Sequence, residues 1–310
     1  LVQLYRQLKP DLVHHVSIKP VLYGGLAAKF AGRPAVVSAM SGLGYVFIGD
    51  TFKSKLIRLL VRPFLYPALS GKCTRMIFQN TEDRQHFINM GLIDMTRAAL
   101  IRGSGVDMTQ FTPQPEPDDT VQVLFAGRLM WKKGVGDFVE AAKRLQGQAK
   151  FVIVGYAEAS SPDNVPPEQL KQWQDAGFIE WWGKRDDMPD IFAASHLVCL
   201  PSSYGEGVPK VLIEAAASGR AIVTTDTPGC RDIVRHNHNG LLVPPGDTDA
   251  LTEALHRLIQ DNTLRQQMGK YGRNRAVNEF SLEIVNQQSL QLYADLLKNT
   301  ANTPVTTHES

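Results

Sequence analysis

Short apolar runs alternate with longer amphipathic runs along almost the whole chain, and this alternation limits the possible folds more than any other feature. Runs such as "PAVVSAM", "VQVLFAG" and "KFVIVG" are each followed by a segment in which apolar residues recur at helical spacing. Repeated strand–helix units of this kind predict parallel sheets with helices packed against them. A length of 310 residues favours two such domains over one.

The segment "TPQPEPDDT" (112–120) interrupts the alternation with three prolines and three acids, so we interpret it as a linker. It would separate a partial first domain (1–111) from a second domain (121–280), both doubly wound α/β. A helix over 281–298 is expected to pack back toward the first domain, and the tail 299–310 to be disordered. Ligands bind such sheets at the carboxyl ends of the strands, which makes the cleft between the domains the expected site.

The expected elements follow from the same pattern. Expected strands cover 10–16, 34–40, 74–80, 98–104, 121–127, 150–155, 178–183, 196–201 and 220–225. Expected helices cover 19–31, 52–69 (interrupted by Pro63 and Pro67), 82–90, 135–145, 168–175, a short one near 191, one after Pro209, 249–260, 264–279 and 282–297.

Composition excludes several classes of protein. The net charge of +2 gives no nucleic-acid signature. Cys73, Cys199 and Cys230 are too widely spaced for a metal site and form no even disulfide set, so we expect reduced thiols in a cytosolic protein. No apolar run approaches the roughly 20 residues that span a bilayer. The chain begins at Leu1 without a signal peptide and enters directly into a helix-like pattern, so we expect an upstream part.

The stretch "SSYGEGVPKVLIEAAASG" carries the first candidate residues. Glu214 interrupts an otherwise apolar helix, and a buried carboxylate without a partner is costly, so a polar partner is expected. Before the helix, two glycines let the backbone approach a ligand, and a helix N-terminus suits phosphate. Glu206 and Glu214 would then face one ligand, and carboxylates are natural hydrogen-bond acceptors for sugar hydroxyls. Alternatively, Glu206 complements the helix dipole and Glu214 pairs with a lysine or arginine.

A second stretch, "VLFAGRLMWKKG", places Arg128 and Lys133 just past the end of the first strand of the second domain. Two cations on such a loop can hold a diphosphate. Lys132 is interpreted as a solvated surface charge.

Together these motifs resemble the nucleotide-sugar-binding domain of the family 4 glycosyltransferases, which have the GT-B fold of two Rossmann-like domains facing a cleft. The Glu-x7-Glu motif matches Glu206 and Glu214, and the Gly-Arg-Leu…Lys-Gly motif matches 127–129 and 133–134. "VGYA" (154–157) approximates the family's VGxG, and "SGVD" (104–107) its hinge. The resemblance covers most of the chain.

The resemblance implies a retaining, metal-independent transfer from a nucleotide-sugar donor, expected to be a UDP-sugar. Glu214 would bind the ribose and Glu206 the donor sugar, with Arg128 and Lys133 on the diphosphate; Glu206, Arg128 and Lys133 are the expected catalytic residues. The remaining donor-binding residues implied are Gly155, Lys184, Arg185, Gly207, Val208, Lys210 and Val211. The base would lie against 183–185. Asp186-Asp187 is interpreted as a helix start rather than a metal motif.

On the acceptor side, many family members carry a histidine where this chain has Ser41, followed by Gly42. His14 and His15 end the preceding strand and could substitute, although packed or capped histidines are the alternative. The sequence therefore does not predict that a histidine takes a direct part in catalysis.

The segment between Thr51 and Asn80 has no acidic residue and mixes cations with apolar side chains. It predicts either an ordinary packed helix or a helix on an anionic membrane surface, bound through Lys53, Lys55, Arg58 and Arg62. The motif sequences resemble those of bacterial enzymes that build capsule, O-antigen and N-glycan precursors, including enzymes that transfer N-acetylgalactosamine. This implies a sugar acceptor linked to undecaprenyl diphosphate and a peripheral location on the inner face of the cytoplasmic membrane. The alternatives are transfer to a soluble acceptor, or a nucleotide-sugar-binding protein without activity.

Overall fold

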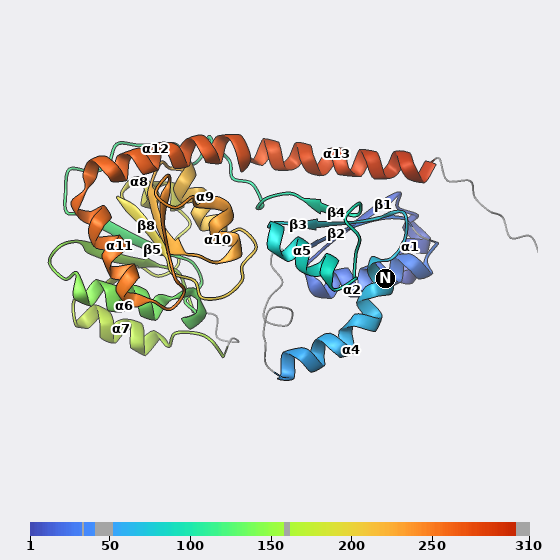
Figure 1. The fold of residues 1–310 in the computed structure, drawn as a ribbon, viewed down its shortest axis with the longest axis horizontal. Helices are drawn as coiled ribbons and strands as arrows, with labels where there is room; N and C mark the ends of the chain where they lie inside the picture. The colour runs from blue at the N-terminus through green and yellow to red at the C-terminus, as the bar shows by residue number, and fades with distance from the viewer. Residues whose placement is uncertain (33, 41–51, 158–161, 302–310) are drawn as a thin grey trace, which may run out of the picture. The chain divides into compact units, whose positions relative to one another are not determined.

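The computed structural model of the chain forms two compact units (Figure 1). It describes residues 1–32, 34–40, 52–157 and 162–301, with the backbone alone at 52–55, 57, 58 and 299–301. Unit 1 comprises Leu1–Gly103 and the chain from Glu283 onward, and unit 2 comprises Ser104–Leu282.

Unit 1 is built on a parallel sheet of four strands in the order β1-β2-β3-β4. Its elements are α1 (Val2–Leu8), β1 (Leu12–Val16), α2 (Ile18–Phe30), β2 (Ala35–Met40), α4 (Phe52–Leu69), β3 (Thr74–Phe78), α5 (Thr81–Asn89), β4 (Ala98–Leu100) and α13 (Leu282–Ala301). Successive side chains of a strand point to opposite faces, and both faces are covered here. Phe78 packs with Leu65 and Phe87 in one apolar cluster, whereas Ile77 packs with Val285 of α13 in another.

Two features of unit 1 bear on the sequence-based expectations. Helix α13 contributes Val285 and Leu296 to the core of unit 1. The expected interruption of the helix over 52–69 is wrong, because α4 continues through Pro63 and Pro67. A proline removes one helical hydrogen bond, and burial of Leu65 and Leu69 of the same turns offsets that loss.

Unit 2 is a parallel sheet of six strands in the order β10-β9-β8-β5-β6-β7. Its elements are β5 (Gln122–Ala126), η1 (Trp131–Lys133), α6 (Val135–Arg144), β6 (Lys150–Val154), α7 (Pro167–Asp175), β7 (Glu180–Trp181), α8 (Met188–Ala193), β8 (Leu197–Leu200), α9 (Lys210–Ala217), β9 (Ala221–Thr225), α10 (Pro228–Ile233), β10 (Gly240–Val243), α11 (Thr248–Gln260) and α12 (Asn262–Glu279). The first strand, β5, lies in the middle, and the order reverses between β5 and β8, which are neighbours in Figure 1. In open α/β sheets, this switch point is where ligands bind.

The segment 112–120, expected to be a linker, belongs to unit 2. Glu116 forms a buried ion pair with Arg265 of α12, with 2.7 Å between Glu116 Oε2 and Arg265 Nη2. The carbonyl of Pro117 lies 3.0 Å from the Nε2 atom of His196. The boundary between the units falls earlier, at Gly103 and Ser104. Prolines and acids suggested an exposed connection, and the buried partners of Glu116 explain why the segment packs instead.

The expected strands and helices otherwise agree with the structure, with differences at their ends. Helix α10 was not expected, although Thr227-Pro228 is a common start signal. Helix α8 does follow Asp187, but the Asp187 side chain pairs with Arg185 instead of capping the helix.

Candidate active site

The loops that follow β5, β6 and β7 are hydrogen-bonded to one another at the carboxyl ends of these strands. Gly127 N donates to Val154 O (3.0 Å), and Gly155 N donates to Gly183 O (2.8 Å). Gly155 has φ 149°, and a Cβ there would lie 1.8 Å from Gly127 O. Only glycine fits this close approach of two backbones, so the expected donor-binding residue Gly155 has a structural reason to be glycine.

The loop between β8 and α9 is anchored to η1, which follows β5. Ser203 N donates to Lys132 O at 2.8 Å. Gly134 has φ 78°, and a Cβ there would lie 2.1 Å from Pro201 O. These contacts bring the loop that carries Glu206 against the turn that carries Lys133.

Lys133 and Glu206 form an ion pair with 2.8 Å between Nζ and Oε2. Their side chains are only 11% and 13% exposed, so water screens the pair weakly. The second carboxylate oxygen, Glu206 Oε1, is buried and has no hydrogen-bond partner among the described residues. Buried polar atoms are normally paired, so Glu206 Oε1 keeps an unused capacity to accept a hydrogen bond.

A cavity of about 240 Å³ lies along the carboxyl ends of β5 and β6. It adjoins Lys133 through the lining residue Gly127, where an added Cβ would lie 3.8 Å from Lys133 Cδ. Its lining residues are Ala126, Gly127, Arg128, Val154, Gly155, Tyr156, Lys184, Arg185, Met188, Val211 and Glu214. Six of these lining residues were predicted from the sequence to bind the donor: Arg128, Gly155, Lys184, Arg185, Val211 and Glu214.

Glu214 is largely buried in the wall of this cavity. Its Oε1 atom lies 3.3 Å from Nζ of Lys210, one helical turn earlier in α9. Burial raises the pKa of Glu214, and the nearby Lys210 ammonium opposes that rise. Both interpretations of this carboxylate therefore hold in part: it has a lysine partner, and it also faces a cavity.

The other expected donor-site residues surround the same region. Gly207 and Val208 belong to the β8–α9 loop, and Val208 is buried. Lys210 and Val211 open α9, where the first backbone N–H groups of a helix have no acceptor within it. Arg185 is paired with Asp187 through Nε at 2.8 Å.

The two histidines are engaged with tyrosines in unit 1. His14 Nδ1 lies 2.6 Å from the Tyr293 hydroxyl, and His15 Nε2 lies 2.9 Å from the Tyr5 hydroxyl. Burial lowers the pKa of both, and His14 lowers that of His15 further. His15 is buried, which agrees with the packed alternative, whereas His14 is exposed. Ser41 and Gly42 lie outside the described residues, so the acceptor-side assignment stays a prediction.

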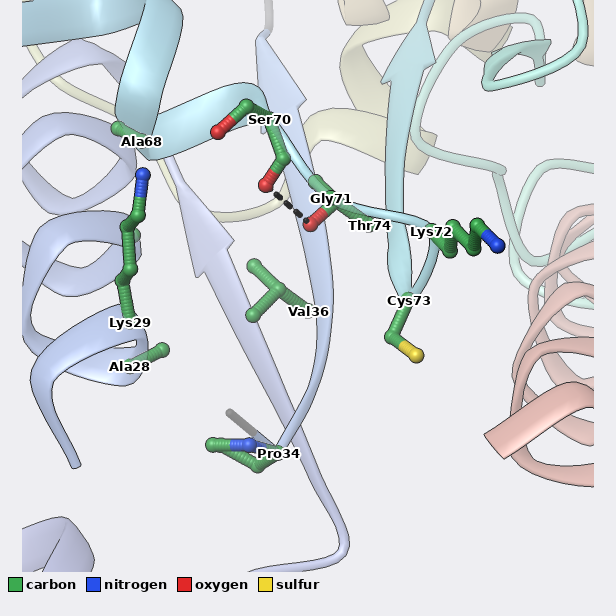
Figure 2. A pocket seen from close by; sticks show the side chains of 11 residues that line it. Ala28, Lys29, Pro34, Val36, Ala68, Ser70, Gly71, Lys72, Cys73 and Thr74 are labelled. Atoms are coloured by element: carbon green, nitrogen blue, oxygen red, sulfur yellow. Dashed lines mark hydrogen bonds between the residues drawn. The ribbon is translucent and has the colours of Figure 1, made fainter. Parts of the chain in front are cut away.

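A larger cavity, of about 400 Å³, lies in unit 1 at the amino ends of β2 and β3 (Figure 2). Figure 2 shows Lys29 and Lys72 on opposite sides of Val36. The hydroxyls in its wall have backbone partners: Ser70 donates to Pro67 O and Thr74 to Ser70 O. None of the predicted site residues lines this cavity, and it lies at the strand ends opposite to those that bind ligands in such sheets.

The basic apolar helix is α4. The side chains of Lys53, Lys55 and Arg58 lie outside the described residues, and Arg62 donates to Met90 O at 3.1 Å. Among the described helices, none has both the length and the hydropathy for crossing a membrane. Among all the residues that the structure describes, no three His, Cys, Asp or Glu side chains are grouped as metal ligands.

Sequence reasoning did not single out two residues that complete this region. Tyr204 is hydrogen-bonded to Arg128 and lies near Lys133. Gly229 is the second residue of α10, and a Cβ there would lie 1.4 Å from Gly207 O. An aromatic residue beside two glycines, at the end of a strand, was the available signal for Tyr204.

Comparison with known proteins gives matches along most of the chain. The family model "Glycosyl transferases group 1" matches residues 107–275, more than half of the chain, and "Glycosyl transferase 4-like" matches residues 1–80. The chain is 28% identical to N,N'-diacetylbacillosaminyl-diphospho-undecaprenol alpha-1,3-N-acetylgalactosaminyltransferase of Campylobacter jejuni, over 96% of this chain and 81% of that protein. It is 29% identical to the UDP-Gal:alpha-D-GlcNAc-diphosphoundecaprenol alpha-1,3-galactosyltransferase of Escherichia coli, over 96% and 80%.

Among solved structures, Anabaena HepE in complex with UDP and glucose has a TM-score of 0.80 at 21% identity, over 95% of this chain and 80% of that one. This similarity confirms the expected α/β fold with parallel, Rossmann-like sheets. The family matches confirm the expected glycosyltransferase family. The chain therefore belongs to the group 1 glycosyl transferases, enzymes of the GT-B fold.

Proposed function

We propose that the protein transfers a hexose or N-acetylhexosamine, with retention, from a UDP-sugar to a sugar linked to undecaprenyl diphosphate, in the assembly of a bacterial surface glycan. The observation that carries this proposal is the buried Lys133–Glu206 pair at the switch point, beside a cavity that Glu214 lines. The names of the Campylobacter and Escherichia relatives support the acceptor class, and the name of the latter supports a UDP-sugar donor.

In this proposal the nucleoside occupies the cavity, with its base against 183–185. The Glu214 carboxylate accepts hydrogen bonds from the ribose hydroxyls, which are the polar partners that a carboxylate in an apolar helix requires. Glu206 Oε1, which has no partner among the described residues, accepts a hydrogen bond from a hydroxyl of the donor sugar.

The diphosphate lies between Arg128, Lys133 and the N-terminus of α9. When the sugar–phosphate bond breaks, negative charge grows on the leaving UDP, and fixed positive charges stabilise it. Arg128 and Lys133 can supply this charge without a metal ion, so we also propose metal-independent transfer. Activity that persists in excess EDTA would support that point.

Selective stabilisation by UDP is the first expected result. At about 100 times its dissociation constant, UDP should raise the free energy of unfolding by about 2.7 kcal/mol, with GDP and ADP having less effect. Tryptophan fluorescence during thermal unfolding reports this in unit 2, which contains all four tryptophans (131, 173, 181 and 182). Equal shifts with all three nucleotides, or none, would contradict the proposed donor.

The variant Glu214→Gln separates nucleotide binding from stability. It should abolish most of the UDP shift, while Glu206→Gln should keep it and lose turnover. Because burial raises the pKa of Glu214, the folded state holds this proton more tightly than the unfolded chain. Ionisation therefore destabilises the wild type as the pH rises above the ordinary glutamate range. Without nucleotide, Glu214→Gln should be as stable as wild type at pH 4 and more stable at pH 7.

We further propose that α4 docks on an anionic membrane at the cytoplasmic face, where lipid-linked acceptors lie. Opposite its buried face, α4 exposes the apolar residues Leu56, Leu59, Leu60, Phe64 and Tyr66. These side chains lie on one side of the helix at 100° per residue, and a basic apolar helix of this kind suits an anionic lipid surface.

Glutamate substitutions at two leucines of similar exposure test this docking. Leu60→Glu should reduce sedimentation with vesicles that contain anionic lipid, by roughly tenfold in partition, since it places a charge in the apolar face. Leu290→Glu is the control, because Leu290 of α13 is exposed to a similar extent (64% against 60%). Equal losses for both variants, or none for either, would exclude α4 as the docking helix.

A further inference from the structure

Tyr204 lies among the charged groups of the proposed diphosphate site. Its hydroxyl is hydrogen-bonded to the Arg128 side chain. The Nζ atom of Lys133 lies 6.0 Å from the centroid of its ring, within reach of a cation–π interaction. The Glu206 carboxylate also acts on it electrostatically. One side chain thus contacts or faces three groups that come from two different loops.

The backbone on both sides of Tyr204 is held in place. On one side, Ser203 N donates to Lys132 O at 2.8 Å. On the other, Gly229 lets α10 approach so closely that an added Cβ would lie 1.4 Å from Gly207 O and 2.7 Å from Glu206 O. A side chain on a loop fixed in this way can set the positions of its neighbours.

The chemistry of tyrosine suits the gap between two cations. Arg128 and Lys133 carry like charges on long, flexible side chains, and Lys133 is also paired with Glu206. The phenolic oxygen accepts a hydrogen bond from the guanidinium, while the electron-rich ring face attracts the ammonium. Burial, and then the Glu206 carboxylate, raises the pKa of Tyr204, so the hydroxyl stays protonated and adds no charge.

We infer that Tyr204 is a positioning residue of the donor site, which holds Arg128 and Lys133 at the separation that a diphosphate bridges. The inference rests on the proposed function. A residue that only fills space would affect all nucleotides alike. A residue that positions the two cations affects ligands in proportion to the phosphates they carry, because the nucleoside part binds elsewhere in the cavity.

The test compares UDP with UMP by calorimetry on the full chain. Tyr204→Phe removes the hydrogen bond to Arg128 and keeps the ring, so UDP affinity should fall roughly tenfold and UMP affinity much less. Tyr204→Leu removes the ring as well and should lower UDP affinity further. Tyr271→Phe, at an exposed position of α12, is the matched control and should leave both affinities unchanged.

Each outcome bears on the inference. A fall in the UDP-to-UMP affinity ratio for Tyr204→Phe, with an unchanged melting temperature, supports it. An unchanged ratio, including equal losses for both nucleotides, overturns it while leaving the proposed donor intact. Failure of the wild type to bind UDP would overturn the proposed function, and this inference with it.

Discussion

Lys133→Ala is expected to lower kcat/KM for the UDP-sugar by about 100- to 1,000-fold, the usual loss when one group that stabilises developing negative charge is removed. Lys133 is almost fully buried and is paired with Glu206 at 2.8 Å. Its removal deletes a cation for the leaving UDP. It also leaves a buried carboxylate beside two phosphates, and this like-charge repulsion adds to the loss.

The neighbouring Lys132→Ala is the control for this prediction. Both lysines belong to η1, but Lys132 is exposed, and it contacts the β8–α9 loop through its backbone carbonyl, which alanine keeps. Lys132→Ala should retain activity within about threefold. The double variant Lys133→Ala/Glu206→Ala removes the unpaired carboxylate, so it should regain thermal stability and remain inactive. Similar rates for the two single lysine variants would contradict the assignment.

Arg265→Ala is expected to destabilise unit 2 by about 3–5 kcal/mol, as breaking a buried ion pair does. Arg265 is 4% exposed and donates to both carboxylate oxygens of Glu116. It also donates to Leu258 O at 2.7 Å, in the last turn of α11. Its loss leaves the buried Glu116 carboxylate and the Leu258 carbonyl without this hydrogen-bond donor.

Urea unfolding followed by tryptophan fluorescence measures this effect in unit 2. A second variant, Arg265→Met with Glu116→Leu, replaces the pair with apolar side chains and should be far less destabilised than Arg265→Ala. An unfolding midpoint for Arg265→Ala within error of the wild type would show that the segment 112–120 is not held by this pair.

The sequence predicted which side chains gather at the proposed donor site, because these residues follow strand ends. Arg128 and Lys133 come after β5, and Glu206 comes after β8, and these strands are neighbours in a parallel sheet. The alternation of strands and helices in the sequence therefore predicts that these side chains lie near one another.

Which charge pairs with which could not be predicted in this way. Glu116 and Arg265 are 149 residues apart, and nothing local to either indicates the other. The same holds for His14 and Tyr293, which meet only because α13 packs on the sheet of unit 1. Hydrophobic periodicity indicates which side of a segment is buried. It does not indicate which distant segment packs against that side, and these pairs depend on such packing. Tyr204 was also missed, although an aromatic residue beside two glycines at a strand end was a local signal for it.

The ends of unit 2 are adjacent. Val106 N donates to Phe280 O and Leu282 N donates to Val106 O, both at 3.0 Å, just inside the boundaries at Ser104 and Leu282. Unit 2 is thus continuous in sequence and closed on itself, while unit 1 is assembled from two separate stretches of chain. In topological terms unit 2 is an insertion into unit 1, an arrangement in which the inserted unit can be exchanged without dividing the sheet of the other.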